Sequence, residues 1–359
     1  MTRVLQLTAM ILMVQLGGGT SWAYRDYFTL EQKEQLAKVQ TVLVEVTALT
    51  DKGAVDAGAL AAVVKERLSE LGYTAVTDPS KPHDVVFKVK CEQRKVWEGT
   101  TPSGGDADLP DSPSRVWKGP ACQLTYMLGG TKVKWQKEVR TDFEDAVQAA
   151  QKANAGDPGV YAMGKLKDLL AQYDFPIMLA AEWGQTDRLL KVLDEPGAKE
   201  LRKLKVIALL GEMLADKALP RLKEALKDKE LAKQAAVSMG NLGKDAVPIL
   251  IEMLKNAKDP ELQAAAAKGL GQVGSSFGDT RVIPPLLEML DAPGIDVKVQ
   301  TEIAWSLGKV PDKRSVEPLF ALDRKLQKIR HDPPDPLIKK LKEAVFWAIK
   351  QCYTEDQYS

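Results

Sequence analysis

The strongest constraint on the fold of this chain is a pattern that occurs four times in its C-terminal half. Residues 205–226, 234–254, 264–290 and 301–322 can be stacked on one another. In each, an apolar stretch ends in an apolar residue and a glycine, a short turn follows, and a proline opens a second apolar stretch. Such repeats predict helix pairs that stack on their neighbours, because one pair cannot bury its apolar face alone.

The glycines and prolines of the repeats each have an expected structural role. We expect each glycine to end the first helix, because glycine adopts the left-handed backbone found at helix ends. Each proline should lie in the first turn of the second helix, where its missing N–H costs no hydrogen bond. Small residues four positions before three of the glycines should let the first helices approach closely. The residues are Gly211, Gly240, Gly271 and Gly308, Pro220, Pro248, Pro284 and Pro318, and Ala236, Ala267 and Ala304.

This pattern resembles HEAT repeats, particularly the short subclass also found in phycobilisome-lyase-like proteins. The resemblance implies an all-α solenoid of about four or five repeats over residues 175–359. A diverged half-repeat at 180–197 would begin the array, and a helix at 337–351 would cap it. The subclass includes enzymes, but the resemblance transfers no catalytic residue to this chain.

One position departs from the usual repeat pattern. A basic residue is common eight positions before the glycine, but here only Lys203 matches. Ala232, Gln263 and Gln300 occupy the equivalent positions of the other repeats. We therefore expect no polar ladder between repeats from this position.

The first 23 residues have the layout of a signal peptide. Arg3 precedes an apolar run over 4–16, and small residues stand at the −3 and −1 positions of a cleavage site after Ala23. The run is too short for a comfortable membrane span, and a retained anchor is the alternative interpretation. Export predicts a periplasmic or secreted protein without a transmembrane segment after signal removal.

Residues 24–156 predict an α+β domain. Apolar alternation and helical spacing favour an antiparallel or mixed sheet that is covered by helices on one face. A Gly-Gly dipeptide at 129–130 predicts the turn of a hairpin. A connecting helix should follow at 157–174. The main predicted elements are strands at 39–49, 84–96, 121–128 and 132–140 and helices at 56–71 and 143–153.

Two cysteines, Cys91 and Cys122, fall in two predicted strands of this domain. In an oxidising compartment they could form a disulfide that closes a loop of about 30 residues. Two buried thiols are the alternative, because connectivity cannot be read from sequence. Cys352 is expected to be a buried helix residue.

A segment at 98–120 interrupts the α+β domain and is rich in Gly, Pro, Ser, Thr and Asp. This composition predicts a long loop. Trp97 and Trp117 bracket it, so it is either a binding loop with aromatic anchors or a disordered insertion.

Composition excludes several classes of function. With 50 basic and 49 acidic residues, the chain lacks the basic excess of a general nucleic-acid binder. Two histidines and three scattered cysteines exclude a multi-histidine site and a zinc cluster. No phosphate-binding loop or nucleophile motif occurs. We therefore predict no catalytic, cofactor-binding or metal-binding residue.

These observations favour an exported, non-catalytic scaffold or accessory subunit that binds protein partners in the cell envelope through its solenoid. One alternative is a lyase-type enzyme or maturation factor with a concave ligand pocket. Another is an envelope ligand-binding module that uses Trp97, Trp117 or Trp135 of the α+β domain. The candidate partner contacts on and beside the second helices are Arg221, Lys223, Lys227, Glu252, Lys255, Glu288, Arg324 and Lys325.

Overall fold

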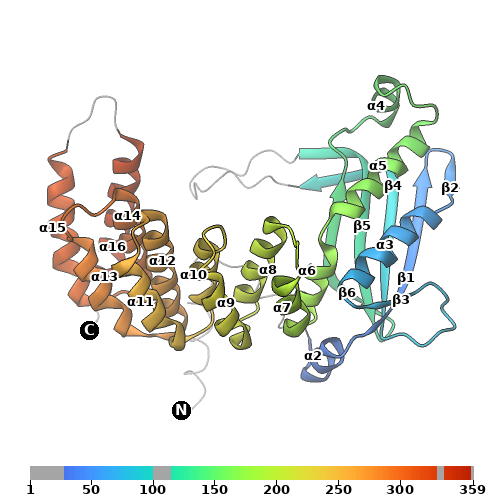
Figure 1. The fold of residues 1–359 in the computed structure, drawn as a ribbon. Helices are drawn as coiled ribbons and strands as arrows, with labels where there is room; N and C mark the ends of the chain where they lie inside the picture. Colours follow the sequence, from blue (N-terminus) through green and yellow to red (C-terminus); the bar gives the residue numbers. More distant parts are fainter. Residues whose placement is uncertain (1–27, 100–114, 330–334, 357–359) are drawn as a thin grey trace, which may run out of the picture. The chain divides into compact units, whose positions relative to one another are not determined.

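The computed structural model describes residues 28–99, 115–329 and 335–356 (Figure 1). The chain divides into two compact units, Met1–Tyr173 and Asp174–Ser359, which we call the sheet unit and the repeat unit. The predicted signal peptide lies outside the described residues. Among the described helices, none is both long and apolar enough to cross a lipid bilayer.

The sheet unit is built on a mixed sheet, as predicted. The strand order is β2-β1-β4-β5-β6, and β3 also pairs with β1. β1 runs parallel to β3 and β4, whereas the other neighbours are antiparallel. The strands are β1 (Thr41–Thr50), β2 (Gly53–Val55), β3 (Thr74–Val76), β4 (Val85–Gly99), β5 (Arg115–Leu128) and β6 (Thr131–Arg140).

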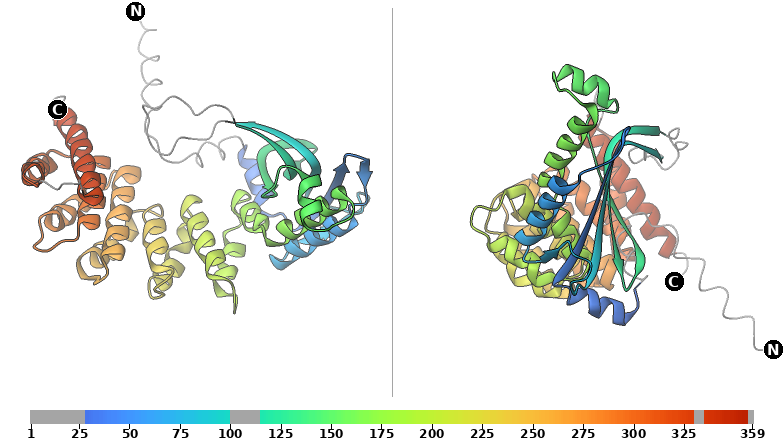
Figure 2. Two further views of the ribbon diagram at one scale, coloured as in Figure 1. Left: turned by 90° about the horizontal axis from the view of Figure 1, so that it is seen from above. Right: turned by 90° about the vertical axis from the view of Figure 1, so that its right-hand side faces the viewer.

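Helices cover one face of this sheet (Figure 2). α3 (Gly58–Glu70) packs against β1, and α5 (Pro158–Gln172) packs against α3 and against β4, β5 and β6. The region predicted as a connecting helix therefore packs within the sheet unit. Alternation along β4 buries Phe87 and Val89. Lys88 lies between them in sequence and pairs with Glu45 of β1 at 3.0 Å.

Several elements of the sheet unit differ from the prediction. β4 and β5 extend into the predicted 98–120 loop, because Val and Trp on both arms favour extended backbone. Residues 100–114 of that loop lie outside the described residues. The sequence patterns also missed β2 and α2 (Leu30–Ala37), and α4 (Ala146–Lys152) is shorter than predicted.

The repeat unit consists of helix pairs followed by a long last helix. The first helices of the pairs, together with the last helix, form the A row, in which each helix contacts the next. The second helices form the B row. The A row is α6 (Phe175–Glu182), α8 (Glu200–Glu212), α10 (Ala232–Met239), α12 (Pro260–Phe277), α14 (Val297–Lys309) and α16 (Pro336–Asp356). The B row is α7 (Thr186–Asp194), α9 (Leu219–Ala225), α11 (Val247–Asn256), α13 (Ile283–Leu290) and α15 (Val316–Gln327).

The four repeat glycines do not have the left-handed backbone that we expected. Positive φ angles occur instead in turn glycines such as Gly243 and Gly278. The repeat glycines lie where neighbouring A-row helices touch. A β-carbon on Gly271 would lie 2.4 Å from Ser306 Oγ, and one on Gly240 would lie 2.6 Å from the carbonyl oxygen of Gly269. The glycines therefore permit close helix packing. The predicted mechanism was wrong because α8, α12 and α14 continue past their glycines, and Gly240, which does cap α10, has right-handed backbone.

The repeat prolines follow the prediction more closely. Pro220, Pro248 and Pro284 lie in the first turn of α9, α11 and α13. Pro318 is the third residue of α15. A three-residue 3₁₀ turn precedes each of these helices: η1 (Asp216–Ala218), η2 (Lys244–Ala246), η3 (Thr280–Val282) and η4 (Lys313–Ser315).

Candidate functional site

The charged residues of the B row connect successive repeats. Arg221 pairs with Asp194 of the preceding repeat, and Lys255 pairs with Glu288 of the next one. Lys325 donates to Asp291 at 2.5 Å. A polar ladder is therefore present, although its residues differ from the position at which the family commonly has a basic residue. These side chains are largely exposed, so each pair contributes little on its own.

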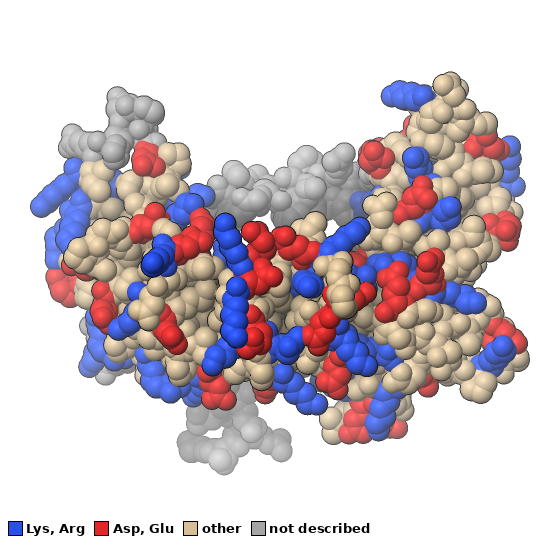
Figure 3. Space-filling model, in the orientation of Figure 1, with Lys and Arg blue, Asp and Glu red and all other residues tan. Residues whose placement is uncertain are grey.

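Six of the eight predicted partner contacts are engaged within the repeat unit. Besides the three ladder pairs, Lys227 pairs with Glu224 at 2.7 Å and Arg324 pairs with Glu317 at 2.6 Å. Lys223 and Glu252 form no ion pair among the described residues. Basic and acidic side chains are interspersed over the molecular face in Figure 3. This B-row surface is charged but mixed in sign.

The A row has its own bridges at the N-terminal ends of its helices. Glu261 of α12 accepts from Lys233 of α10 at 3.1 Å and from Lys298 of α14 at 2.5 Å. The hydrogen bonds from Lys298 and Lys233 lower the pKa of Glu261. One carboxylate thus joins three successive repeats.

Two glutamines occupy the position where the family commonly has a basic residue. The side-chain amide of Gln263 donates to the carbonyl oxygen of Leu254 at 3.2 Å, and Gln300 donates to Leu290 at 2.9 Å. Both acceptors lie in the last turn of the preceding B-row helix, where carbonyls lack intrahelical partners. The amides therefore fix α11 to α12 and α13 to α14, and the expectation of no polar ladder from this position was wrong.

A different surface lies between α14 and α16, the last two helices of the A row. Trp305 of α14 and Trp347 of α16 pack with ring centroids 5.0 Å apart. Phe346 is 62% exposed. Burial and the neighbouring charge of Lys268 lower the pKa of Lys309. Phe346 directly precedes Trp347 and lies on another face of α16, so we call Lys268, Trp305, Lys309 and Trp347 the aromatic–lysine patch.

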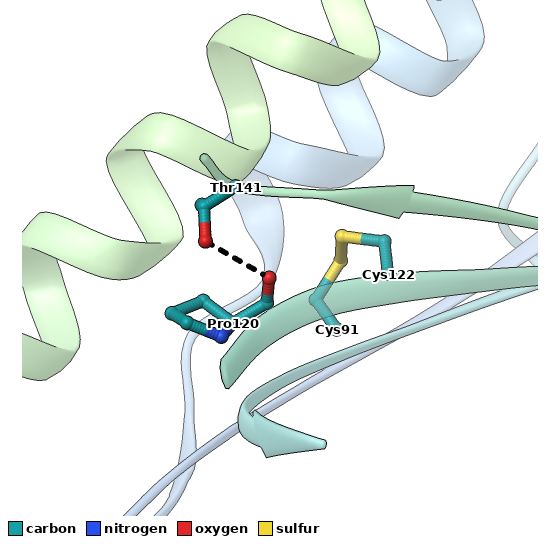
Figure 4. The surroundings of a disulfide bond; sticks show 4 residues. All are labelled: Cys91, Pro120, Cys122 and Thr141. Carbon is teal, nitrogen blue, oxygen red and sulfur yellow. Dashed lines mark hydrogen bonds between the residues drawn. A yellow bond between two sulfur atoms is a disulfide. The ribbon is translucent and has the colours of Figure 1, made fainter. Parts of the chain in front are cut away.

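The two predicted cysteines of the sheet unit form a disulfide (Figure 4). Cys91 and Cys122 are opposite each other on β4 and β5, with an S–S distance of 2.02 Å, and both are fully buried. Just beyond them, the carbonyl oxygen of Pro120 accepts hydrogen bonds from the backbone N–H of Thr141 at 3.1 Å and from its hydroxyl at 3.2 Å. The disulfide joins β4 to β5 and the Thr141 contacts join β5 to the end of β6, at the base of the part of the β4–β5 hairpin that extends beyond β6. Cys352 is a free, buried thiol in α16, as predicted.

A cavity of about 380 Å³ lies beside this hairpin base. Its polar lining is partly engaged: Arg94 pairs with Asp51 at 2.9 Å, and Asp145 caps α4. No group of three or more potential metal ligands occurs among the described residues. The lining residues are Gln93, Arg94, Lys118, Glu144, Asp145, Ala146 and Val147.

The three tryptophans predicted as ligand contacts of the sheet unit lie in different surroundings. Trp97 and Trp117 are opposite each other in the β4–β5 register, and their side chains lie outside the described residues. Trp135 is 3% exposed and packs against Phe87 and Tyr126, so it cannot contact an external ligand.

Comparison with known families identifies the type of repeat in the repeat unit. A family model described as HEAT repeats matches residues 219–298 and 247–332. The repeat unit contains HEAT repeats. The sheet unit matches no family model.

Thirteen chains of solved structures match this protein at a significant level. The structure of human deoxyhypusine hydroxylase in complex with glycerol is similar at 16% identity and a TM-score of 0.26. The match covers 57% of this chain and 92% of that one. No curated protein sequence matches the chain at a significant level.

The aromatic–lysine patch of the HEAT repeats was missed at the sequence level, although a signal was present. Trp305 stands three residues before Gly308. The equivalent positions before the other repeat glycines are Ala208, Val237 and Lys268. An aromatic residue at an otherwise small, aliphatic or charged repeat position marks a site where one repeat differs from its neighbours.

Proposed function

We propose that this chain is an exported, non-catalytic scaffold or accessory subunit that binds protein partners in the cell envelope through its HEAT repeats. The observation that carries the proposal is the stacked helix array, held in register by ion pairs and amide bridges between repeats. Solenoids of this kind offer extended surfaces to partners. A pre-ordered surface also reduces the entropic cost of association.

Two features support export. The N-terminal 23 residues have the layout of a signal peptide. The Cys91–Cys122 disulfide is of a kind that forms and persists in oxidising compartments, and is rare in reducing ones. A periplasmic or secreted location is consistent with both features.

Fractionation and crosslinking in the native host test this proposal. We expect the full chain to be recovered from the periplasm or medium with a mature N-terminus near Tyr24. We also expect the repeat unit to crosslink reproducibly to defined proteins, identified by mass spectrometry against an exported, non-interacting control protein. A cytosolic chain with an intact N-terminus would contradict export, and repeats that crosslink no more than the control would contradict the scaffold role.

The cavity at the hairpin base favours a second candidate function, binding of a small polar ligand by the sheet unit. Arg94 and Lys118 would supply the charges for such a ligand. Thermal denaturation with a panel of envelope-derived sugars, peptides and anions tests it. A stabilising compound should lose its effect in Arg94→Ala and Lys118→Ala, and a panel without any shift would contradict this function.

A further inference from the structure

Two lysines of the A row have no ion-pair partner in the part of the chain that the structure describes. At the N-terminal ends of α10, α12 and α14, Lys233 and Lys298 both reach Glu261. Further along α12 and α14, Lys268 and Lys309 form no ion pair among the described residues. Repulsion from Lys268 contributes to the lowered pKa of Lys309, so the two ammonium groups form a local positive charge that Glu302 only partly offsets.

The same stretch carries exposed aromatic surface. The Trp347 ring lies against Gly308, at which a β-carbon would be 2.4 Å from the ring, and Trp305 packs beside it. Both tryptophans are partly exposed. Phe346 lies on another face of α16, because consecutive residues of a helix do not face each other, and the Lys350 Nζ lies 5.3 Å from its ring centroid.

We infer that the aromatic–lysine patch docks an acidic amphipathic helix of a partner protein. Partner carboxylates would meet Lys268 and Lys309, while partner apolar side chains would pack on Trp305 and Trp347. This inference rests on the proposed scaffold function and specifies the surface and the partner's chemistry. Aromatic residues in partly buried positions are typical anchors of protein interfaces.

The charge environment of Lys309 supports an acidic partner. Burial and the charge of Lys268 lower its pKa by more than Glu302 raises it. A carboxylate brought by a partner would compensate both effects and raise the pKa of Lys309. A lipid surface fits less well, because the two tryptophans are not free to insert into it. Both pack along the helices and are only partly exposed.

Binding of designed peptides to the full chain tests the inference. The probes are two 18-residue helical peptides with the same leucine face, one with glutamates and the other with lysines on its polar face. We expect the acidic peptide to bind at least about tenfold more tightly by fluorescence anisotropy. Lys268→Glu/Lys309→Glu should weaken it at least about tenfold, as should Trp305→Ala/Trp347→Ala. The matched control, Lys217→Glu/Lys244→Glu, reverses two exposed lysines outside the patch and should change little.

A second readout separates packing damage from loss of a charge contact. The pKa of Lys309, followed by NMR of its side-chain nitrogen, should rise when the acidic peptide binds. Equal affinity for both peptides, or equal weakening by the control variant, would overturn the inference. So would binding of phosphatidylglycerol vesicles, but not of the acidic peptide, through Lys268 and Lys309. Self-association of the chain through the patch, seen by sedimentation, would also overturn it.

Site-specific photocrosslinking in the native host distinguishes this inference from the proposed function. A crosslinker at Glu302 reports on the patch, and one at Lys223 reports on the B row. Capture of an acidic helical segment at Glu302 supports the inference. Capture at Lys223 alone overturns the inference but leaves the scaffold function standing, whereas capture at neither position contradicts both.

Discussion

The sheet unit and the repeat unit hold themselves together over different distances in sequence. In the sheet unit, Lys52 pairs with Asp157 at 2.5 Å across 105 positions, and Arg67 donates to the carbonyl oxygen of Tyr173 across 106. In the repeat unit, the bridge from Lys325 to Asp291 spans 34 positions, and that from Ser306 to Ala267 spans 39. The contacts of the sheet unit thus join distant parts of the sequence, whereas those of the repeat unit join neighbouring repeats.

This difference predicts different responses to damage. A sheet that pairs distant segments must lose its long-range contacts together, so a local change should destabilise the whole sheet unit. A stack of repeats behaves approximately as a one-dimensional chain of neighbours, so damage should fade with distance along it. Hydrogen exchange followed by mass spectrometry resolves the two cases, because it reports protection segment by segment.

The largest expected effect comes from removing the disulfide. Cys91→Ala/Cys122→Ala should lower the free energy of unfolding of the sheet unit by roughly 3–4 kcal/mol, since an unfolded chain without the crosslink gains loop entropy. Hydrogen exchange should accelerate together in β1, β4, β5 and β6. The matched control, Cys352→Ala, removes a buried thiol of α16 and should affect only the C-terminal end of the repeat unit. Faster exchange confined to β4 and β5 would contradict the cooperative behaviour assigned to the sheet unit.

The next effect concerns helix contact in the A row. Gly271→Ala should destabilise the repeat unit by about 1–3 kcal/mol, because the new β-carbon would meet Ser306 and force α12 and α14 apart. Gly164→Ala is the control, since Gly164 is also helical but has no atom within 4 Å of a new β-carbon. It should stabilise α5 slightly through helix propensity. Denaturant titration gives the free energy of unfolding of both variants. A change of the same sign in both would contradict the close-packing role of Gly271.

These two predictions also mark where sequence reasoning reached its limit. The helix pairs and the mixed sheet were predicted correctly, because hydrophobic spacing and turn residues act locally. The role of Gly271 was not, because a repeat pattern gives its position but not whether the helix ends there. The B-row residues Arg221 and Lys255 were identified as charged surface, but their partners on other repeats depend on how the helices stack. The patch around Trp305 and Trp347 required the same stacking to bring two helices together.

A smaller effect should follow from losing one amide bridge. Gln300→Ala removes the donor to the Leu290 carbonyl oxygen and should cost about 1 kcal/mol, the usual contribution of one hydrogen bond. Exchange should accelerate at the C-terminal end of α13 and the N-terminal end of α14. Gln327→Ala is the control, because its amide forms an exposed hydrogen bond with the Asp323 side chain of the same helix. An equal loss of stability in both variants would show that the bridge between helices contributes nothing specific.

The smallest predicted effect is the most direct test of neighbour coupling. Glu261→Gln removes a carboxylate that bridges α10, α12 and α14, and should cost about 0.5 kcal/mol at pH 7 because the site is exposed. The folded-state pKa of Glu261 lies below its ordinary value of 4.5. Its contribution is therefore fully present above that value and is lost as the pH falls through the folded-state pKa.

The difference in unfolding free energy between wild type and Glu261→Gln should thus shrink on acidification, and also in concentrated salt. Asp157 in the sheet unit also has a lowered pKa, caused first by its hydrogen bond with Lys52, so acid alone weakens both units. Only the comparison of wild type with Glu261→Gln isolates the pH dependence of the repeat unit. If its hydrogen-exchange effect stops at α10 and α14, coupling is limited to neighbouring repeats. If the effect reaches α6 and α8, the array acts as one cooperative body, and binding at the aromatic–lysine patch would then stabilise helices far from it.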